Sequence, residues 1–371
     1  MIELRNDPAS DWQRATCYLN GEWIALADAK VSVLDRGFIF GDGVYEVIAV
    51  DTVDGIRAPF RAHAHFARLQ RSLDAVRIDN PLQLEQWIDL TAEVIERHLW
   101  PRQLVYVQVT RGVAKRDHPF PAGVAPTVFV STSPWPAIPS EQVEQGVAAV
   151  THVDERWLHC DIKSTSLLGN VLMKQYAIDN AASETVMLRN GFLTEGSSTN
   201  ISVIKDGVIS TPPKSVQILP GITVDGIAHI AQQHGVNVDV RPITASELAT
   251  ADEIWLCSSG REVLAIVSID GAVVGSGKPG PMYRTMHEWF QQAKREDARN
   301  WVAQRGARSI ETRAGASMSS HRRSSKSCRR TRLISIPARS RCAPRRTATI
   351  YPSPPRFARR RASSLTICIA R

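Results

Sequence analysis

The chain contains 371 residues, of which 43% are hydrophobic and 22% are charged. This length suggests two domains or three, and the hydrophobic content is sufficient to bury a core. No apolar run approaches the roughly 20 residues of a membrane-spanning helix, and the first residues lack the apolar centre of a signal peptide, so we expect a cytoplasmic protein. The six cysteines include no C-x-x-C pair, which argues against a zinc site or a disulfide framework and fits a reducing compartment.

The net charge of +8 is unevenly distributed along the chain. Residues 298–371 contain 18 arginines, one lysine and one acidic residue, whereas the residues before them contain 26 basic and 36 acidic ones. The body is therefore acidic, and nucleic-acid binding is not expected of it. The segment 297–371 is rich in Arg, Ser, Ala and Pro, which predicts a disordered tail. Two interpretations stay open: a basic arm that binds nucleic acid, or a gene read in a shifted frame, which we favour.

Strands and helices are interspersed along the chain, and no internal repeat is apparent. Asn20-Gly21 predicts a hairpin, and the glycines of residues 35–50 suggest strands and turns. Apolar spacing of three to four residues predicts helices at 63–78, 82–99, from Ser166 onward, at 221–235 and at 282–296. Runs rich in Val, Ile and Thr predict strands at 104–112, 126–133, 146–153, 185–196, 200–211 and 253–271.

The segment 131–142 contains three prolines and resembles a stiff linker. It would separate a small N-terminal α/β domain, residues 1–130, from a larger C-terminal domain, residues 143–296, with the tail at 297–371. The mixture of elements predicts an α+β or α/β fold in two lobes.

Lys163 stands directly before a strongly apolar segment, in the stretch CDIKSTSLLGNVLMKQYA. An amine held against apolar surroundings is poorly solvated in its charged form, so its pKa falls and it can act as a nucleophile. A lysine that caps a helix is the simpler interpretation of these residues alone. Glu195 ends an apolar strand, where it is either a satisfied turn acid or a group that holds a proton on a heterocyclic nitrogen.

Three further features suggest an anion site, although each is weak alone. The turn LPGIT, residues 219–223, enters a helix whose first N–H groups and Thr223 hydroxyl can bind a phosphate. The stretch CSSGRE, residues 257–262, offers two hydroxyls before a glycine, and Arg68 lies on a predicted helix. A lysine, a distant acid, two hydroxyl-rich turns and an arginine are together what pyridoxal phosphate requires.

The chain resembles the fold-type IV, or class IV, pyridoxal-phosphate-dependent aminotransferases, and most closely those specific for D-amino acids. The resemblance covers about residues 17–292 and leaves out the tail. It rests on the order and spacing of these stretches: DRGFIFGDGVYEV (35–47), HFARLQRS (65–72), VTRGVAKRDHPFP (109–121), RWLHCDIKSTSLLGNVLMKQYA (156–177), TEGSSTNI (194–201), LPGITV (219–224) and SSGREV (258–263).

The resemblance implies a role for each candidate residue. Lys163 corresponds to the lysine that is linked to pyridoxal 5′-phosphate and moves the proton, and Glu195 to the partner of the pyridine nitrogen. The phosphate site is implied to comprise Arg68, Ile222, Thr223, Ser258 and Ser259. The cofactor is expected between two lobes of a homodimer, in which a loop of the small lobe helps to close the partner's site. Gly260 and Arg261 differ from the small hydroxyl residues of the family, which affects the side chains accepted.

Arg116 and His118 match the pair that, with Tyr45, binds the substrate carboxylate in the D-specific enzymes. A basic loop lying in solvent is the simpler interpretation, but the motif favours transamination between D-amino acids and a 2-oxo acid such as 2-oxoglutarate or pyruvate. Three alternatives stay open: a branched-chain L-amino-acid aminotransferase, an aminodeoxychorismate lyase, and a basic-tailed binding protein on an inactive body. His63 and His65 are expected to pack or cap rather than bind metal, and no metal site is expected.

Overall fold

The computed structural model describes the backbone of residues 15–324 and the side chains of residues 15–305. The chain divides into two units after Ala314, and the described residues of the first unit contain both sheets. The expectations for residues 325–371 lie outside the described residues. None of the described helices is long and apolar enough to cross a membrane.

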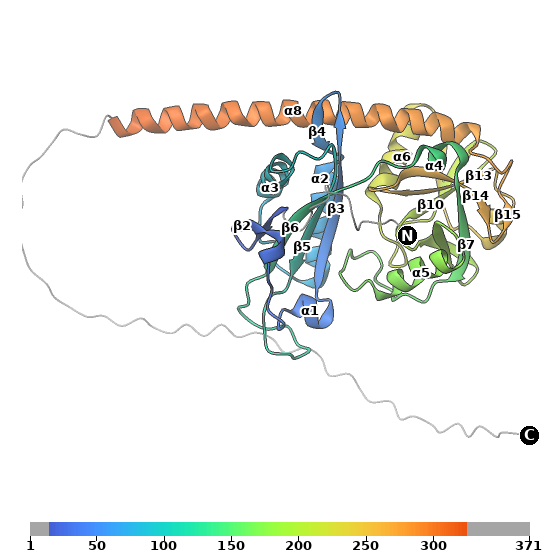
Figure 1. Ribbon diagram of the computed structural model, residues 1–371, viewed down its shortest axis with the longest axis horizontal. Helices are drawn as coiled ribbons and strands as arrows, with labels where there is room; N and C mark the ends of the chain where they lie inside the picture. The colour runs from blue at the N-terminus through green and yellow to red at the C-terminus, as the bar shows by residue number, and fades with distance from the viewer. Residues whose placement is uncertain (1–14, 325–371) are drawn as a thin grey trace, which may run out of the picture. The chain divides into compact units, whose positions relative to one another are not determined.

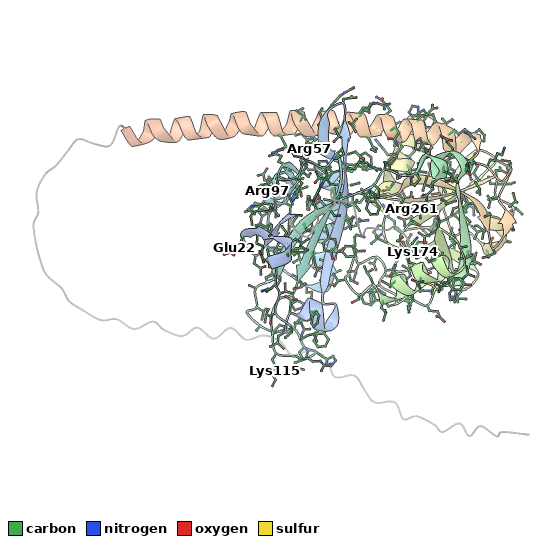
Figure 2. All side chains as sticks on the ribbon, viewed as in Figure 1. Glu22, Arg57, Arg97, Lys115, Lys174 and Arg261 are labelled. Carbon is green, nitrogen blue, oxygen red and sulfur yellow. The ribbon has the colours of Figure 1, made fainter. Side chains whose placement is uncertain are left out.

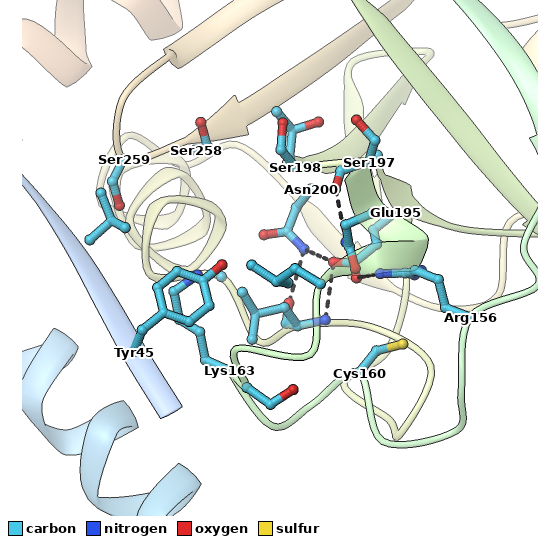
Figure 3. A pocket seen from close by; sticks show the side chains of 18 of the residues that line it. Tyr45, Arg156, Cys160, Lys163, Glu195, Ser197, Ser198, Asn200, Ser258 and Ser259 are labelled. Atoms are coloured by element: carbon cyan, nitrogen blue, oxygen red, sulfur yellow. Dashed lines mark hydrogen bonds and ion pairs between the residues drawn. The ribbon is translucent and has the colours of Figure 1, made fainter. Parts of the chain in front are cut away.

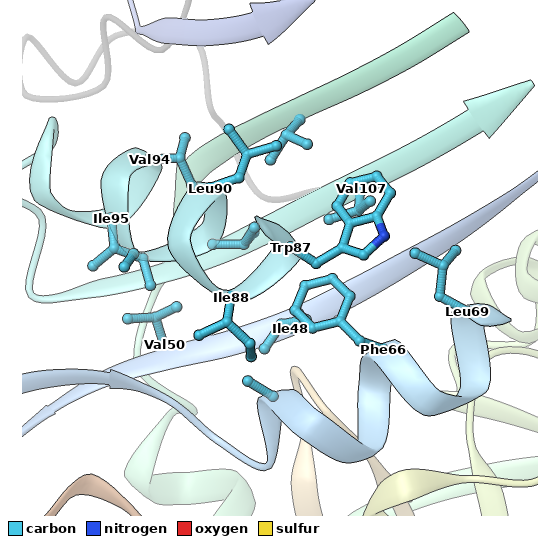
Figure 4. Close-up of a cluster of buried hydrophobic side chains, with 14 of the residues drawn as sticks. Ile48, Val50, Phe66, Leu69, Trp87, Ile88, Leu90, Val94, Ile95 and Val107 are labelled. Atoms are coloured by element: carbon cyan, nitrogen blue, oxygen red, sulfur yellow. The ribbon is translucent and has the colours of Figure 1, made fainter. Parts of the chain in front are cut away.

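The first sheet has six antiparallel strands in the order β2-β1-β6-β5-β3-β4 (Figure 1). Its strands are β1 (Thr16–Leu19), β2 (Glu22–Ala25), β3 (Gly43–Val53), β4 (Ile56–Pro59), β5 (Arg102–Thr110) and β6 (Thr127–Pro134). Helices α2 (Ala62–Val76) and α3 (Leu84–Glu96) pack on the sheet and share one apolar core with it. Phe66 of α2 stacks on Trp87 of α3 with their ring centroids 5.8 Å apart (Figure 4).

The second sheet has nine described strands, in the order β12-β11-β10-β13-β14-β7-β8-β9 with β15 paired to β14. They are β7 (Val147–Val153), β8 (Glu184–Arg189), β9 (Phe192–Gly196), β10 (Asn200–Lys205), β11 (Val208–Thr211), β12 (Val238–Val240), β13 (Glu253–Ser258), β14 (Glu262–Ile269) and β15 (Ala272–Val273). The helices of this lobe are α4 (Ser140–Gln145), α5 (Leu168–Asp179), α6 (Ile222–Gln233) and α7 (Ala245–Ala249). Successive residues of β13 enter different cores, Ile254 one and Trp255 the other, so the sheet is covered on both faces.

Two local expectations have clear outcomes. The Asn20-Gly21 hairpin is confirmed, because both residues have positive φ, 51° and 102°, between β1 and β2. The helix α1 (Arg36–Phe40) was not anticipated within residues 35–50. It forms because the Asp35 side chain caps its first turn and Gly41 ends it with a φ of 65°.

The segment around 131–142 is less irregular than expected. Strand β6 continues to Pro134 and helix α4 begins at Ser140, so regular structure is interrupted only over residues 135–139. Pro134 lies at the end of its strand, where the missing N–H is tolerated. The division of the chain into domains at this segment stays a prediction.

The expected end of ordered structure near residue 297 is wrong for the adjoining residues. The last helix, α8 (Pro281–Ser324), continues through this point. Its buried stripe starts with Tyr283, Met286 and Phe290 in a core of the second sheet. Ala298 and Trp301 extend the stripe, and both belong to the core of the first sheet. Ala298 and Trp301 stand three residues apart, which is helical spacing. Two apolar residues are a weak signal within a basic segment, so the composition concealed this buried face.

Trp301→Ala is expected to destabilise the protein by about 3 kcal/mol, because it leaves a cavity in the first core. Thermal unfolding followed by circular dichroism measures the loss. Val302→Ala is the matched control, since Val302 is 49% exposed and its truncation is expected to stay within about 0.5 kcal/mol. Equal melting temperatures for the two variants would contradict the packing of α8 on the first sheet.

Candidate active site

A cavity of about 420 Å³ is lined by residues from both lobes. This volume lies within the range of small-molecule sites, roughly 300–1,000 Å³. Eight of the predicted site residues line it: Tyr45, Arg68, Lys163, Glu195, Ile222, Thr223, Ser258 and Ser259. Figure 3 shows Tyr45 and Lys163 on one side, Glu195 with Arg156 on the other, and Ser258 and Ser259 near Tyr45.

Lys163 is held in the cavity by backbone pairing to β3. Its carbonyl accepts a hydrogen bond of 2.9 Å from the Tyr45 N–H, and Ser164 forms a β-bridge with Val44. The N–H of Lys163 donates to the Ser72 hydroxyl of α2 at 3.2 Å. Strand β3 and helix α2 both form hydrogen bonds with the backbone of Lys163. The position of its Cα, from which the side chain enters the cavity, is therefore fixed.

The electrostatic surroundings of Lys163 increase the fraction of its neutral amine. Burial, reinforced by the positive charge of Arg68, lowers the pKa of Lys163 to about 8. The side-chain nitrogen lies 4.2 Å from the centroid of the Tyr45 ring. Burial also raises the pKa of Tyr45 to about 12, so this phenol keeps its proton at neutral pH. The amine therefore has the properties of a nucleophile and of a proton acceptor.

Glu195 lies near the end of β9 and is 5% exposed. Its Oε1 accepts from Arg156 at 2.6 Å, and its Oε2 accepts from the Leu219 N–H at 3.0 Å and the Asn200 amide at 3.2 Å. Burial raises the pKa of Glu195 to about 7, although Arg156 opposes the rise. A carboxyl with this pKa at the wall of a cavity suits a hydrogen bond to a protonated ring nitrogen.

Arg156 lies in a motif of the sequence but was not expected to be a site residue. It lines the cavity and is fixed by Asp154, which accepts from its Nε at 3.0 Å and its Nη2 at 2.9 Å. The charge of Arg156 is thus shared between Asp154 and Glu195. Its place seven residues before Lys163 was the available signal, but only the tertiary structure reveals its partner.

Arg68 forms the opposite end of the cavity and is almost fully buried. Its Nε and Nη2 donate to the two oxygens of Glu46 at 2.7 and 2.9 Å, and its Nη1 donates to the Pro220 carbonyl at 3.0 Å. His65 also forms a hydrogen bond with Glu46, at 2.7 Å, and is buried. A guanidinium has five N–H donors; three are used, and two remain for an anion.

The first turn of α6 lies beside Arg68 and supplies further anion donors. The first N–H groups of a helix have no carbonyl partner within it, and here they belong to Ile222 and Thr223, which line the cavity. Gly221 permits this approach, because a Cβ there would collide with Oδ1 of Asn200. The Ser258 and Ser259 side chains add hydroxyls from the end of β13. Together with Arg68 these groups form a site for a phosphate.

Arg116 and His118 lie elsewhere among the described residues and do not line this chain's cavity. Both contact the ring of Phe40 in α1: the guanidinium carbon lies 5.3 Å and the imidazole centroid 5.5 Å from its centroid. Arg36 holds their loop by donating to the Asp117 carbonyl at 2.5 Å and the His118 carbonyl at 3.4 Å. Their side chains are exposed.

Comparison with known proteins agrees with this arrangement. Residues 43–269 match the family described as amino-transferase class IV. The D-alanine aminotransferase of Staphylococcus aureus (strain MSSA476) is 40% identical over 276 residues, which is 74% of this chain and 96% of that protein. The D-alanine aminotransferase of Bacillus licheniformis is 38% identical over 274 residues, covering 74% of this chain and 95% of that protein.

Solved structures share the fold. The branched-chain amino acid aminotransferase of T.th. with pyridoxamine 5′-phosphate has a TM-score of 0.73 at 26% identity, over 76% of this chain and 95% of that chain. The branched-chain amino acid aminotransferase of Escherichia coli has a TM-score of 0.68 at 25% identity, over 74% of this chain and 92% of that chain. The fold class expected from the sequence is confirmed.

Glu195→Gln is expected to change how the stability of the ligand-free protein depends on pH. The folded-state pKa of about 7 exceeds the ordinary value of 4.5, so the folded state binds more protons between these values. Stability therefore falls as pH rises through that window, by at most about 1.4 kcal/mol per pH unit.

The glutamine side chain cannot titrate. The melting temperature of the Glu195→Gln variant should therefore fall less steeply between pH 4.5 and pH 7 than that of the wild-type protein. Differential scanning fluorimetry at closely spaced pH values measures both slopes. The exposed Glu141 of α4 offers a control in Glu141→Gln, which should keep the wild-type slope. Identical slopes for all three proteins would show that Glu195 titrates normally.

Proposed function

The chain belongs to the class IV aminotransferases, and we propose that it transfers the amino group of D-amino acids, D-alanine among them, to a 2-oxo acid. The family depends on pyridoxal 5′-phosphate, so the protein is a cofactor-dependent transaminase. One observation carries the proposal: Lys163 and Glu195 line the same cavity. Lys163 has a pKa of about 8, and Glu195 is fixed by hydrogen bonds to other residues, among them Arg156. The free, buried cysteines Cys17, Cys160 and Cys257 support a cytoplasmic location.

The residues of the cavity fit the cofactor. Two unused N–H donors of Arg68, the α6 N-terminus and the hydroxyls of Ser258 and Ser259 would hold the phosphate. Glu195 would accept the hydrogen bond of the pyridine nitrogen, and Lys163 would bind the aldehyde carbon. A Cβ at Gly221 would displace Asn200, which links Glu195 to the phosphate end.

When bound, pyridoxal phosphate supplies an aldehyde for the amino group and a ring that accepts electrons. Lys163 would then remove the proton from the substrate Cα and deliver it to the former aldehyde carbon of the cofactor, since an amine with a pKa of about 8 exchanges protons readily near neutral pH. Glu195 would accept the hydrogen bond of the ring N–H, because Arg156, Asn200 and the Leu219 N–H fix the orientation of its carboxylate. A 2-oxo acid accepts the amino group by the same steps in reverse.

The substrate carboxylate is proposed to bind Tyr45 of one chain with Arg116 and His118 of a second copy. Tyr45 lines the cavity, whereas the other two residues lie on an exposed loop. An arginine fork beside histidine and tyrosine donors suits a carboxylate. The separation of these residues within one chain supports a homodimer that shares its sites.

Exposed apolar side chains support the same assembly. Phe38 of α1 and Leu168 of α5 are each 72% exposed, and Val171 and Leu172 of α5 are 59% and 57% exposed. The ends of the two helices are adjacent, because the hydroxyl of Ser166, just before α5, donates to the Gly41 carbonyl at 3.2 Å. Large exposed apolar surface of this kind usually marks an interface.

Incubation of the holoenzyme with D-alanine and 2-oxoglutarate is expected to form pyruvate and glutamate, whereas L-leucine should react at least about tenfold more slowly, given the loss of one well-placed charge-assisted contact. Chiral chromatography of the products provides the measurement. Faster reaction of L-leucine would favour the branched-chain alternative suggested by the solved structures.

Mixing two inactive variants tests the shared site. Lys163→Ala should lose about 10²–10⁴-fold in turnover, and the double variant Arg116→Ala/His118→Ala should lose carboxylate binding. After subunit exchange, mixed dimers contain one intact site, and the mixture should recover up to about a quarter of wild-type activity.

Each variant subjected to the same exchange alone is the control, and neither should recover. Absence of recovery, despite mixed dimers detected by native mass spectrometry, would show that Arg116 and His118 act within their own chain or not at all.

A further inference from the structure

One basic side chain lines the cavity beside α5 and the turn after β13, and a second basic side chain lies next to it. Lys174 of α5 lines the cavity, and Arg261 follows Gly260, which also lines it. Nζ of Lys174 and Nη1 of Arg261 both donate to the Ser183 carbonyl, at 2.5 and 3.1 Å. Figure 2 shows the two labelled side chains close together on the lobe of the second sheet.

Neither cation has a carboxylate within ion-pair distance among the described residues. Arg68 and Arg156, two other cations of the cavity, are each bound to a carboxylate. The negative charge of Glu184 opposes the lowering of the pKa of both Lys174 and Arg261. Its oxygens, however, already accept hydrogen bonds from Thr185, Ser197, Ser198 and Thr199.

Lys174 and Arg261 are therefore both half-buried, and the carboxylate that acts on them, Glu184, already accepts hydrogen bonds from other residues. Removing a charge from water is unfavourable unless a counterion compensates for the loss of hydration. Burial and the charge of Arg261 both lower the pKa of Lys174, which is the response expected of a cation without its own counterion. The arrangement is thus complementary to an anion that enters the cavity.

The turn that carries Arg261 is fixed rather than loose. The Trp135 indole donates to the Gly260 carbonyl at 3.0 Å, and a Cβ at Gly260 would lie 3.3 Å from the Trp135 ring. The Arg261 N–H also donates to the Ser258 hydroxyl at 3.3 Å. The cofactor phosphate has its own donors at Arg68, the first turn of α6, Ser258 and Ser259, so it does not require these two cations.

We propose that Lys174, with Arg261 beside it, binds the distal carboxylate of a dicarboxylic substrate such as 2-oxoglutarate or D-glutamate. This inference rests on the proposed function and deepens it, because it assigns a specificity-determining contact to the same cavity. The α-carboxylate is bound by Tyr45 and the loop of the second copy, and the side-chain carboxylate by Lys174. Arg261 acts as a positioning residue that adds positive charge and holds the shared carbonyl.

The test compares acceptors with one and two carboxylates in the holoenzyme, with D-alanine as donor. Lys174→Gln keeps a donor for the Ser183 carbonyl but removes the charge. It should lower kcat/KM for 2-oxoglutarate about tenfold or more, the effect of one charge-assisted hydrogen bond, and leave 2-oxobutyrate within about twofold. Lys174→Arg should retain the preference for 2-oxoglutarate, and Arg261→Gln should weaken it in the same direction as Lys174→Gln.

The matched control is Lys205→Gln, which removes one charge from an exposed lysine of β10 that pairs with Asp252 and lies outside the cavity. It should not change the ratio of the two acceptors. A second measurement does not require turnover: glutarate should raise the melting temperature of the wild-type holoenzyme more than butyrate, and this difference should vanish in Lys174→Gln.

Equal losses with both acceptors would overturn the proposal, since Lys174 would then bind the α-carboxylate or support the fold. Unchanged kinetics in Lys174→Gln would overturn it as well. If the wild-type protein transfers no amino group from D-alanine, the proposed function fails. In that case the glutarate and butyrate measurement still decides whether Lys174 binds a distal carboxylate.

Discussion

The backbone pairing of Lys163 to Thr165 with the open end of β3 is the interaction on which the site depends. Strand β4 pairs with β3 only from Val50 to Val53, so the end of β3 at Gly43 is free to accept another segment. The chain of the second lobe takes that position, with bonds from Tyr45 to Lys163 and from Thr165 to Gly43. Loss of this pairing would separate the amine from the rest of the cavity, even if every side chain were retained.

The two ends of the cavity use buried ions in different ways. Glu46 is bound by Arg68 on both oxygens, and although burial alone would raise its pKa, Arg68 and His65 hold it well below its usual range. Glu195 shares Arg156 with Asp154, so burial outweighs the ion pair and its pKa rises to about 7. One carboxylate is therefore a permanent counterion, whereas the other changes its protonation readily. The first property keeps the Arg68 guanidinium in place at the phosphate end. At the other end, a ring nitrogen that carries a proton would favour the ionised form of Glu195, because an opposite charge nearby lowers the pKa of a carboxyl.

Most helices and strands, and the motifs of the site, could be predicted from the sequence. The residues that these motifs contact in the folded protein could not. The Asn20-Gly21 turn and the apolar periods are local signals, because dihedral preference and side-chain spacing act within a few residues. Lys163 and Glu195 were found because they lie in motifs whose order is characteristic. Arg156 became visible as a site residue only with the fold, since its bond to Glu195 joins residues 39 positions apart.

Longer-range packing explains the other differences. The extension of α8 past residue 297 depends on Ala298 and Trp301 meeting a core built from residues far earlier in the chain. Composition indicated disorder there, because basic residues such as the exposed Arg299 stand between the members of the buried stripe. Lys174 was unremarkable as a single cation, and Arg261 was noted only as a departure from the family. The significance of the pair comes from a shared carbonyl and the lack of an ion-pair partner among the described residues.

Recognition of the substrate carboxylate links the proposed dimer to specificity. Two arginines of the cavity are committed, Arg68 to Glu46 and Arg156 to Asp154 and Glu195. Arg116 is available, but Arg36 fixes its loop away from this chain's own cavity, and Asp42 anchors Arg36 at 2.7 Å. A loop anchored in this way is organised before any partner arrives, which lowers the entropy lost on association. In the proposed dimer, the same contact that joins two copies completes the binding site of each, so a monomer would retain the cofactor site but lack the carboxylate site.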